Sequence, residues 1–219
     1  MIAPTTAENR GDRRRAWTRA ALVAAARELL AHENGTESSI QEITDLADVG
    51  FGSFYNHFPA KTDLFNAAIA ETLEEHGTML DELTANIEDP ADVFATSIRL
   101  TARLPKTHPQ MAKILLNTGA AYFAAETGLA PRARRDILAA RDAGRFVVGD
   151  AQVALACVGG ALLGVLDLAV TGSATPEALD RAADQLALYL LSMFDVPRDD
   201  AERICARHLP TVSGWASSR

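Results

Sequence analysis

Apolar residues recur at intervals of three and four positions along most of this chain, which is the spacing of one face of an α-helix. The first such stripe lies between Trp17 and Glu33 and stops at Asn34-Gly35, a pair that commonly ends helices. No segment shows the sustained alternation of apolar and polar residues that half-buried strands need. The pattern therefore predicts an all-α fold.

Two short helices around a tight turn are predicted over residues 39–58. Ser39 is followed three residues later by Glu42, which is the capping-box pattern that begins a helix. Residues 47–50 form the expected turn, and residues 51–58 form the second helix, which a following proline ends. Six apolar positions are spaced so that the two crossed helices share one small core: Ile40, Ile43, Leu46, Val49, Phe54 and Phe58. This design is typical of a helix-turn-helix, whose second helix enters a DNA major groove.

The remaining chain carries the same helical periodicity in longer segments, separated by proline, glycine and capping residues. These predicted helices span residues 61–87, 90–104, 107–128, 131–144, 150–170, 175–194 and 198–208. Their lengths are sufficient for a second, larger helical domain with its own core.

The net charge of the 219 residues is −8, which taken alone opposes DNA binding. Salt screens charges within roughly 8–10 Å, so the placement of the charges matters more than their sum. Five arginines cluster near the start of the chain: Arg10, Arg13, Arg14, Arg15 and Arg19. The chain can therefore present a basic end to DNA while an acidic body keeps it soluble.

The sequence lacks the motifs of common enzymes and metal sites. Its histidines have no H-E-x-x-H spacing, and there is no G-x-S-x-G or phosphate-binding glycine loop. Cys157 and Cys205 form no C-x-x-C pair. The longest apolar stretch, residues 151–170, is interrupted by glycines and by Asp167, and the N-terminus does not resemble a signal peptide. We therefore expect a cytoplasmic protein that is not an enzyme, with no cofactor, no metal and no membrane partner.

Residues 49–64, V-G-F-G-S-F-Y-N-H-F-P-A-K-T-D-L, resemble the signature of the TetR family of one-component transcriptional regulators. The resemblance covers residues 16–65. It departs from the family pattern at Asp48, where a turn glycine is usual, and at Gly50, where a serine or threonine usually caps the second helix. Without a hydroxyl at the cap, the helix is expected to lose roughly a few tenths of a kcal/mol.

The resemblance implies a domain plan and a function. We expect a flexible basic arm over residues 1–15, a three-helix helix-turn-helix DNA-binding domain over 16–65, an effector-binding and dimerisation domain over 66–208, and a flexible tail over 209–219. The expected function is a ligand-responsive repressor that binds a near-palindromic operator in double-stranded DNA as a homodimer. A small hydrophobic effector would release it. The alternative is a DNA-binding regulator without a small-molecule ligand, controlled by a protein partner.

Several residues are candidates for DNA contact. The resemblance assigns Tyr55, His57 and Lys61 to phosphates. Phe51 either touches a thymine methyl or folds back onto its own core. The arginines of the arm either reach a minor groove or add only non-specific attraction. The full set of candidates is Arg13, Arg14, Arg15, Ser39, Gln41, Phe51, Gly52, Ser53, Tyr55, Asn56, His57 and Lys61.

The last two long helices carry small residues on one side and a broad apolar stripe, which favours close helix packing between subunits. The alternative is ordinary core within one subunit. Candidate dimer residues are Cys157, Gly160, Ala161, Gly164, Leu168, Leu179, Leu186, Tyr189, Leu190 and Met193. Cys157 is otherwise expected to be a small buried hydrophobe. Asp167, a lone acid in an apolar helix, is expected to find a partner across an interface or to line a wet pocket.

The middle helices would hold the effector if the resemblance extends to them. An apolar lining suits a hydrophobic small molecule, although such a stripe is also typical of simple core. The candidate ligand residues are Phe94, Ile98, Leu104, Met111, Leu115, Tyr122 and Phe123.

Overall fold

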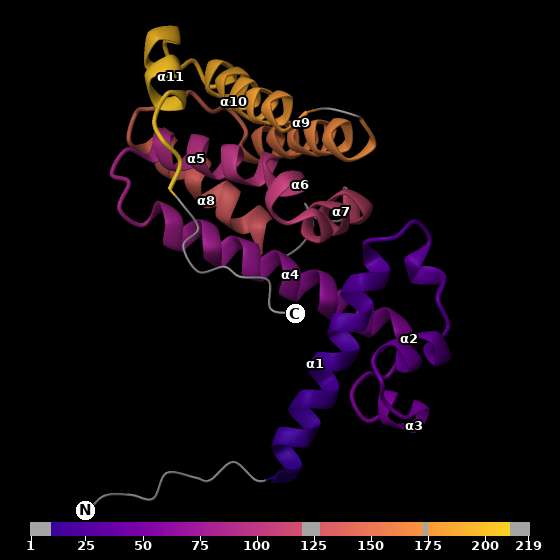
Figure 1. Ribbon diagram of the computed structural model, residues 1–219. Coiled ribbons are helices and arrows are strands. Elements are labelled where there is room, and N and C mark those ends of the chain that lie inside the picture. Colours follow the sequence, from indigo (N-terminus) through magenta and orange to yellow (C-terminus); the bar gives the residue numbers. More distant parts are fainter. Residues whose placement is uncertain (1–9, 120–127, 173–174, 211–219) are drawn as a thin grey trace, which may run out of the picture. The chain divides into compact units, whose positions relative to one another are not determined.

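The computed structural model describes residues 10–119, 128–172 and 175–210. Within these ranges every regular element is a helix, which confirms the all-α prediction (Figure 1). The chain divides into two compact units, with the division between Ile69 and Ala70, inside a continuous helix, α4 (Lys61–Thr84). The domain boundary expected at residue 65 therefore lies near the start of this same helix. The predicted ligand residues Tyr122 and Phe123 and most of the predicted tail lie outside the described residues.

The first unit is built from four elements and the first turns of α4. They are α1 (Arg10–Leu30), η1 (Gly35–Glu37), α2 (Ile40–Leu46) and α3 (Phe51–Phe54). Helix α1 begins at Arg10 and not at Trp17, so the arginines at positions 13–15 lie on a helix and not on a flexible arm. Sequence reasoning missed this because the first two turns are almost entirely polar and leave no apolar stripe to detect.

Helix α2 begins with the predicted capping box. The Glu42 backbone N–H donates to Ser39 Oγ at 3.2 Å, and the Ser39 backbone N–H donates to Glu42 Oε2 at 2.7 Å. Helix α3 is shorter than predicted, because its α-helical part ends at Phe54 and turns continue to residue 57. Ile43 and Phe54 are fully buried between these helices, whereas Leu46 is 43% exposed and does not belong to the core.

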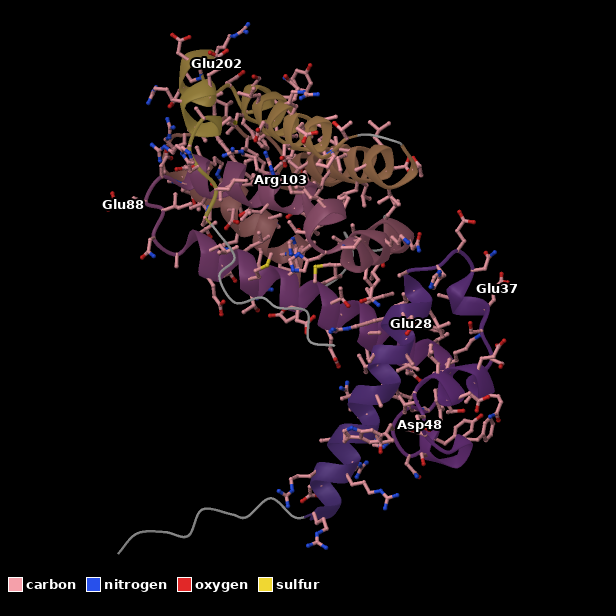
Figure 2. All side chains as sticks on the ribbon, in the orientation of Figure 1. Glu28, Glu37, Asp48, Glu88, Arg103 and Glu202 are labelled. Atoms are coloured by element: carbon pink, nitrogen blue, oxygen red, sulfur yellow. The ribbon has the colours of Figure 1, made fainter. Side chains whose placement is uncertain are left out.

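The turn between α2 and α3 contains a strained residue. Asp48, labelled in Figure 2, has a φ of +52°, in the left-handed region that favours glycine. We expect Asp48→Gly to raise the free energy of unfolding by about 1 kcal/mol, because glycine has no Cβ to clash in this conformation. Asp45→Gly in α2 is the control and is expected to lower it by roughly 0.5 kcal/mol, because glycine favours helix less than aspartate and the hydrogen bond from Gln41 Nε2 to Asp45 Oδ1 is lost. Thermal unfolding measures both, and equal effects of the two substitutions would refute the strain at Asp48.

The second unit contains the rest of α4 and seven further described helices. These are α5 (Pro90–Ala102), α6 (Leu104–Thr107), α7 (Pro109–Thr118), α8 (Leu129–Asp142), α9 (Ala151–Thr171), α10 (Pro176–Met193) and α11 (Arg198–Cys205). Side chains cap three of these helices, since Asp89, Asp150 and Thr175 each accept a backbone N–H of the following helix, and the predicted helix starts at 90, 150 and 175 agree with them to within one residue. The helix predicted over residues 90–104 ends at Ala102, and Pro105 lies in the first turn of the next helix, α6, where proline is tolerated.

Helices α5 and α8 lie between α4 on one side and the pair α9–α10 on the other (Figure 1). The centre is apolar and includes an aromatic cluster, in which Phe146 stacks on Phe194 at 4.5 Å and Phe94 meets both rings edge-on. Arg99 of α5 and Arg103, the residue that follows α5, both pair with Asp184 of α10, and these contacts fix α5 against α10. Helices α5 and α10 are therefore held together by both apolar packing and ion pairs.

Candidate nucleic-acid interface and effector cavity

The predicted DNA-contacting side chains of α2 and α3 gather on the outside of the first unit. Phe51 is 47% exposed and Tyr55 is 55% exposed, with their rings edge-on at 6.0 Å. Phe51 thus stands at the surface and is not folded into its own core. The other exposed members are Ser39, Gln41, Gly52 and Asn56, while Ser53, His57 and Lys61 are half-buried. Polar and aromatic groups on adjacent helix starts are the surface that groove reading requires.

Cations surround this surface. Arg15 extends from α1 toward the turns that follow α3, and its Nη2 lies 3.5 Å from the Asn56 carbonyl oxygen. Burial, and then the nearby Arg15 and Arg19, lower the pKa of His57. A neutral His57 beside two arginines can donate a hydrogen bond to a phosphate whose charge the arginines attract. Arg13 and Arg14 are exposed on the same helix, so the basic group extends along α1.

Lys61 has a structural role as well as a candidate DNA role. Its Nζ donates to the Ser38 carbonyl oxygen at 2.9 Å, which ties the start of α4 to the segment before α2. Lysine has three N–H donors, so two stay available to a phosphate. Its position at the first residue of α4 places a cation where the helix dipole disfavours it by roughly 0.3–1 kcal/mol, and a bound phosphate would reverse that sign.

We expect Lys61→Ala to weaken DNA binding about equally for all sequences, because phosphate contacts carry little sequence information. The slope of log affinity against log salt should fall by roughly one. Fluorescence anisotropy at several salt concentrations measures both quantities. Thermal unfolding of Lys61→Ala measures the stability that is lost with the hydrogen bond to the Ser38 carbonyl oxygen. The salt slope measures the lost phosphate contact separately. An unchanged salt slope would leave Lys61 with the structural role alone.

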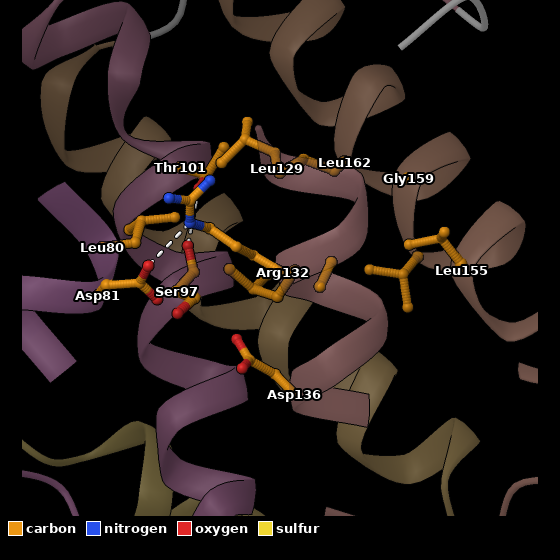
Figure 3. A pocket seen from close by; sticks show the side chains of 13 residues that line it. Leu80, Asp81, Ser97, Thr101, Leu129, Arg132, Asp136, Leu155, Gly159 and Leu162 are labelled. Carbon is orange, nitrogen blue, oxygen red and sulfur yellow. Dashed lines mark hydrogen bonds and ion pairs between the residues drawn. The ribbon is translucent and has the colours of Figure 1, made fainter. Parts of the chain in front are cut away.

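The second unit contains a cavity of about 50 Å³ between α4, α5, α8 and α9 (Figure 3). Its lining is mainly aliphatic, with a few polar groups at one side. The lining residues are Leu80, Asp81, Ser97, Ile98, Thr101, Leu129, Arg132, Ala133, Asp136, Leu155, Val158, Gly159 and Leu162. An apolar pocket with few convergent polar groups is the usual form of a small-molecule site.

Most polar groups of this cavity are already engaged. Thr101 Oγ1 donates to the Ser97 carbonyl oxygen at 2.8 Å and lies 2.9 Å from Nε2 of the buried His76. Because the threonine proton is used, His76 must donate from Nε2. Burial, and then His108, lowers the pKa of His76 to about 3, so this histidine is neutral.

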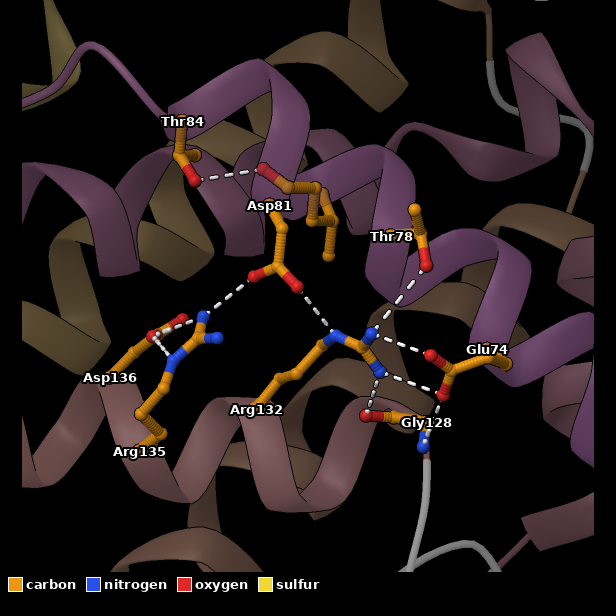
Figure 4. Close-up of polar contacts among 9 residues, drawn as sticks. Glu74, Thr78, Asp81, Thr84, Gly128, Arg132, Arg135 and Asp136 are labelled. Carbon is orange, nitrogen blue, oxygen red and sulfur yellow. Dashed lines mark hydrogen bonds and ion pairs between the residues drawn. The ribbon is translucent and has the colours of Figure 1, made fainter. Parts of the chain in front are cut away.

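Asp136 is the exception among the lining polar groups. Both nitrogens of Arg135 that reach it contact the same oxygen, Oδ1, at 2.9 and 2.8 Å (Figure 4). No described residue hydrogen-bonds its Oδ2, and Figure 3 shows the carboxylate pointing from α8 toward α5. Burial raises the pKa of Asp136. A largely buried carboxylate whose second oxygen has no hydrogen-bond partner among the described residues can accept a hydrogen bond from a hydroxyl group.

The cavity differs from the predicted ligand set. Ile98 is the one residue of that set that lines it within the described part of the chain. Phe94 belongs to the aromatic cluster, Leu104 and Leu115 are buried elsewhere, and Met111 is half-buried. The lining is shifted from α6 and α7 to α8 and α9. Sequence reasoning missed Asp136 because it follows three arginines, Arg132, Arg134 and Arg135, in a helix whose charge pattern is typical of a solvated basic face.

Helices α9 and α10 leave an apolar face uncovered in the single chain. Leu168 is 70% exposed and Tyr189 67%, and Met193 and Val153 are also exposed. Gly160, Gly164 and Cys157 lie on the same face of α9, so Cys157 is not the buried hydrophobe that was expected. Ala161 and Leu179 are half-buried. Leu186 and Leu190 are buried in the core of the chain itself, which corrects their assignment to an interface.

Two further features of α9 and its surroundings bear on partners. Asp167 is exposed on the apolar face, with its backbone carbonyl accepting from Thr171 Oγ1 at 2.7 Å. By length and composition α9 is apolar enough to cross a membrane, a property that core and interface helices share. Among the described residues no group of three or more histidine, cysteine or acidic side chains is placed to hold a metal.

Known protein families match both the part of the chain that carries the DNA-contacting surface and the part that carries the cavity. Residues 22–68 match the bacterial regulatory proteins of the tetR family, and residues 89–207 match the tetracyclin repressor-like C-terminal domain. The chain is similar to RolR in complex with resorcinol, at 34% identity over 92% of this chain and 99% of that one, with a TM-score of 0.72. RolR without ligand matches at 33% identity over 89% of this chain and 100% of that one, with a TM-score of 0.70.

A transcriptional regulator from Rhodococcus sp. Rha1 shares the fold at 22% identity. The match covers 82% of this chain and 98% of that one, with a TM-score of 0.59. No curated protein sequence matches the chain.

Proposed function

Because the chain belongs to the TetR family of bacterial regulatory proteins, we propose that it represses transcription as a homodimer and that a small hydroxylated aromatic molecule releases it from its operator. Members of this family are DNA-binding transcription regulators and not enzymes. Such a protein acts in the cytoplasm, where the DNA is. The repressor role, the dimer and the effector each rest on a separate feature of this chain.

The DNA role rests on the exposed surface of α2 and α3. Phe51 and the short polar side chains beside it would read base edges, and Tyr55, His57 and Lys61 would contact phosphates. The arginines on α1 would add contacts to the flanking backbone. One helix-turn-helix reads too few base pairs to be selective, so two copies on a near-palindromic operator are needed.

The dimer rests on the uncovered apolar face of α9 and α10. Soluble monomers rarely leave a contiguous apolar face in water, so a partner surface is expected to cover it. A second copy of the chain supplies a self-complementary face through a two-fold axis, and the small residues Gly160 and Gly164 allow two α9 helices to approach closely. Burial of α9 against a second copy of the chain also accounts for its apolar composition, without a membrane.

The effector class rests on the free oxygen of Asp136 within the aliphatic cavity. The carboxylate would accept a hydrogen bond from a ligand hydroxyl, and the leucines would pack on a ring. A ligand that carries its own carboxylate would be repelled by Asp136. Resorcinol, the ligand of the similar protein RolR, has an aromatic ring and two hydroxyls and fits these requirements.

The volume of the cavity implies that binding changes the structure. About 50 Å³ is well below the ~150 Å³ of an engineered cavity that binds benzene. A ring therefore enters only an arrangement in which α4, α5, α8 and α9 have separated slightly. A ligand that binds this arrangement better than the resting one shifts the population toward it.

Calorimetric titration with resorcinol tests the effector. Asp136→Asn is expected to weaken resorcinol binding about tenfold, because a hydrogen bond to a charged group contributes roughly 1–1.5 kcal/mol more than one to a neutral group. Asp142→Asn is the control, since Asp142 lies on the same helix α8 but is exposed and does not line the cavity. Equal resorcinol affinity for Asp136→Asn and Asp142→Asn would reject Asp136 as the acceptor.

Control by a protein partner is the remaining alternative. It is favoured if neither resorcinol nor any related phenol shifts the melting temperature, while the protein still binds its operator. A cavity lined by a carboxylate that keeps one oxygen available for a ligand has no evident use in such a protein, and this supports the small-molecule proposal.

A further inference from the structure

An amide and a carboxylate are paired on the exposed side of helix α2. Gln41 Nε2 donates to Asp45 Oδ1 at 2.6 Å, and the two residues are four positions apart, which places them one turn apart on the same side of the helix. Both side chains are exposed, whereas Ile43 and Thr44 on the other side of α2 are buried. The pair is therefore turned to the solvent and away from the core of the first unit.

The start of α2 is fixed next to a candidate phosphate contact. The capping box of Ser39 and Glu42 brackets Gln41 and holds the backbone on both sides of it. Lys61 Nζ donates to the carbonyl oxygen of Ser38, three residues before Gln41. A phosphate bound by Lys61 would therefore bring DNA beside the start of α2, where the Gln41 side chain is exposed.

The hydrogen bond to Asp45 determines which groups Gln41 can offer to a base. A carboxylate has acceptors and no donor, so Asp45 holds the amide nitrogen and repels the amide oxygen. The amide therefore cannot turn over, and it keeps its oxygen as an acceptor and its second N–H as a donor. One acceptor and one donor side by side complement the N6 amino group and the N7 atom of adenine in the major groove. Guanine presents two acceptors at this edge, so the fixed amide matches adenine and not guanine.

Asp45 is otherwise unfavourable on a surface that binds DNA. A carboxylate near the phosphates repels them and lowers the affinity for every sequence. A glutamine and an aspartate one turn apart stabilise a helix only weakly. Asp45 is exposed and contributes nothing to the core of the first unit. Orientation of the Gln41 amide is the role that its position and its hydrogen bond support.

We propose that Gln41 reads an adenine in each half of the operator, and that Asp45 is a positioning residue that holds the Gln41 amide in the orientation adenine requires. The proposal rests on the DNA role proposed above, and it involves neither the effector nor the cavity. Removal of the Asp45 carboxylate frees the amide to turn over, so the preference for adenine weakens while binding to DNA in general persists.

Selection of binding sites from a randomised duplex library gives the sequence that the full-length wild-type protein prefers. The same selection with Gln41→Ala identifies the base pair that Gln41 contacts, as the position at which the preference is lost. Fluorescence anisotropy then measures the affinity for the selected site and for three duplexes that carry the other bases at this position. The wild type should prefer adenine there by roughly 5–150-fold, which is the discrimination of one bidentate pair.

Three further variants test Asp45, and circular dichroism checks that each is folded. Asp45→Ala removes the acceptor, and alanine favours helix. Its preference for adenine should fall to near one, while its affinity for DNA of random sequence should not decrease. Asp45→Glu keeps a group with acceptors and no donor, so it should retain most of the preference. Glu28→Ala is the matched control with an unchanged preference, since it also removes one exposed acid from a helix of the first unit, but from α1 (Figure 2).

An adenine preference that Asp45→Ala leaves unchanged would show that the pair of Gln41 and Asp45 serves helix α2 alone. A base other than adenine at the Gln41 position, or no position that depends on Gln41, would overturn its role as a reader. If Asp45→Ala removes the preference at a different base pair, Asp45 contacts that base itself and is not a positioning residue. If the wild type selects no sequence at all, the proposed sequence-specific regulator fails as well, whereas the other outcomes leave it intact.

Discussion

Phe54→Ala is expected to lower the free energy of unfolding of the first unit by about 3–5 kcal/mol and to abolish operator binding. Phe54 is fully buried, and its ring lies 5.4 Å from Tyr55 and 6.2 Å from Phe58. Few other side chains hold α3 in place, because this helix has only four residues. Removing the ring leaves a cavity that a unit of this size has little stability to offset.

Phe51→Ala is the matched control for this prediction. Phe51 lies on the same short helix but is exposed, so its loss should change stability by less than about 0.5 kcal/mol. If Phe51 touches DNA, the control variant should still lose affinity while staying folded. Thermal unfolding and DNA titration of both variants measure the two effects separately. Similar stability losses in the two would contradict the assignment of Phe54 as core and Phe51 as surface.

Leu168→Arg is expected to convert the protein into a monomer at micromolar concentration and to weaken operator binding by more than about a hundredfold. Leu168 is the most exposed of the large apolar residues on α9, at 70%. An arginine there would be buried without a fixed partner at the proposed two-fold interface. Because the residue touches little within its own chain, the monomer should keep its helical content.

Ala139→Arg provides the comparison, since Ala139 is exposed on α8, outside the apolar face of α9 and α10. It should remain dimeric. Light scattering gives the mass of each variant, and circular dichroism shows whether it is folded. A wild-type monomer, or a dimer unaffected by Leu168→Arg, would refute the interface on α9.

Local signals in the sequence were sufficient for the helix-turn-helix and for most helix boundaries. The capping box at Ser39, the caps at Asp150 and Thr175, and the apolar spacing around Phe54 each depend on neighbours a few residues apart. The helical start of α1 was missed, because polar residues such as Arg13 give no periodic signal. Interactions between residues close in sequence can be predicted from a single sequence, whereas a helix without an apolar stripe cannot.

The cavity could not be predicted, because its residues come together only in the fold. Asp81 and Asp136 are 55 positions apart in the chain and meet through Arg135. Leu186 and Leu190 belong to the same stripe as the exposed Tyr189, and only the packing of α10 on α5 decides which side is core. Gly77 is likewise unfavourable inside a helix by sequence alone, and only the fold shows that the Arg132 side chain occupies the space that a Cβ would take. Such assignments need tertiary contacts, which residue spacing does not contain.

Titration of the protein onto DNA from upstream of its own gene, with and without resorcinol, tests the central claim most directly, and an inverted repeat in that DNA is the expected operator. Fluorescence anisotropy at physiological salt should give an affinity at least ~10³ times that for a shuffled sequence. Resorcinol should lower it by about 5–150-fold, and operator DNA should lower the affinity for resorcinol by the same factor. Equal affinity for the operator and the shuffled sequence would contradict the account of a sequence-specific regulator. Tight operator binding that resorcinol leaves unchanged would contradict the account of its effector.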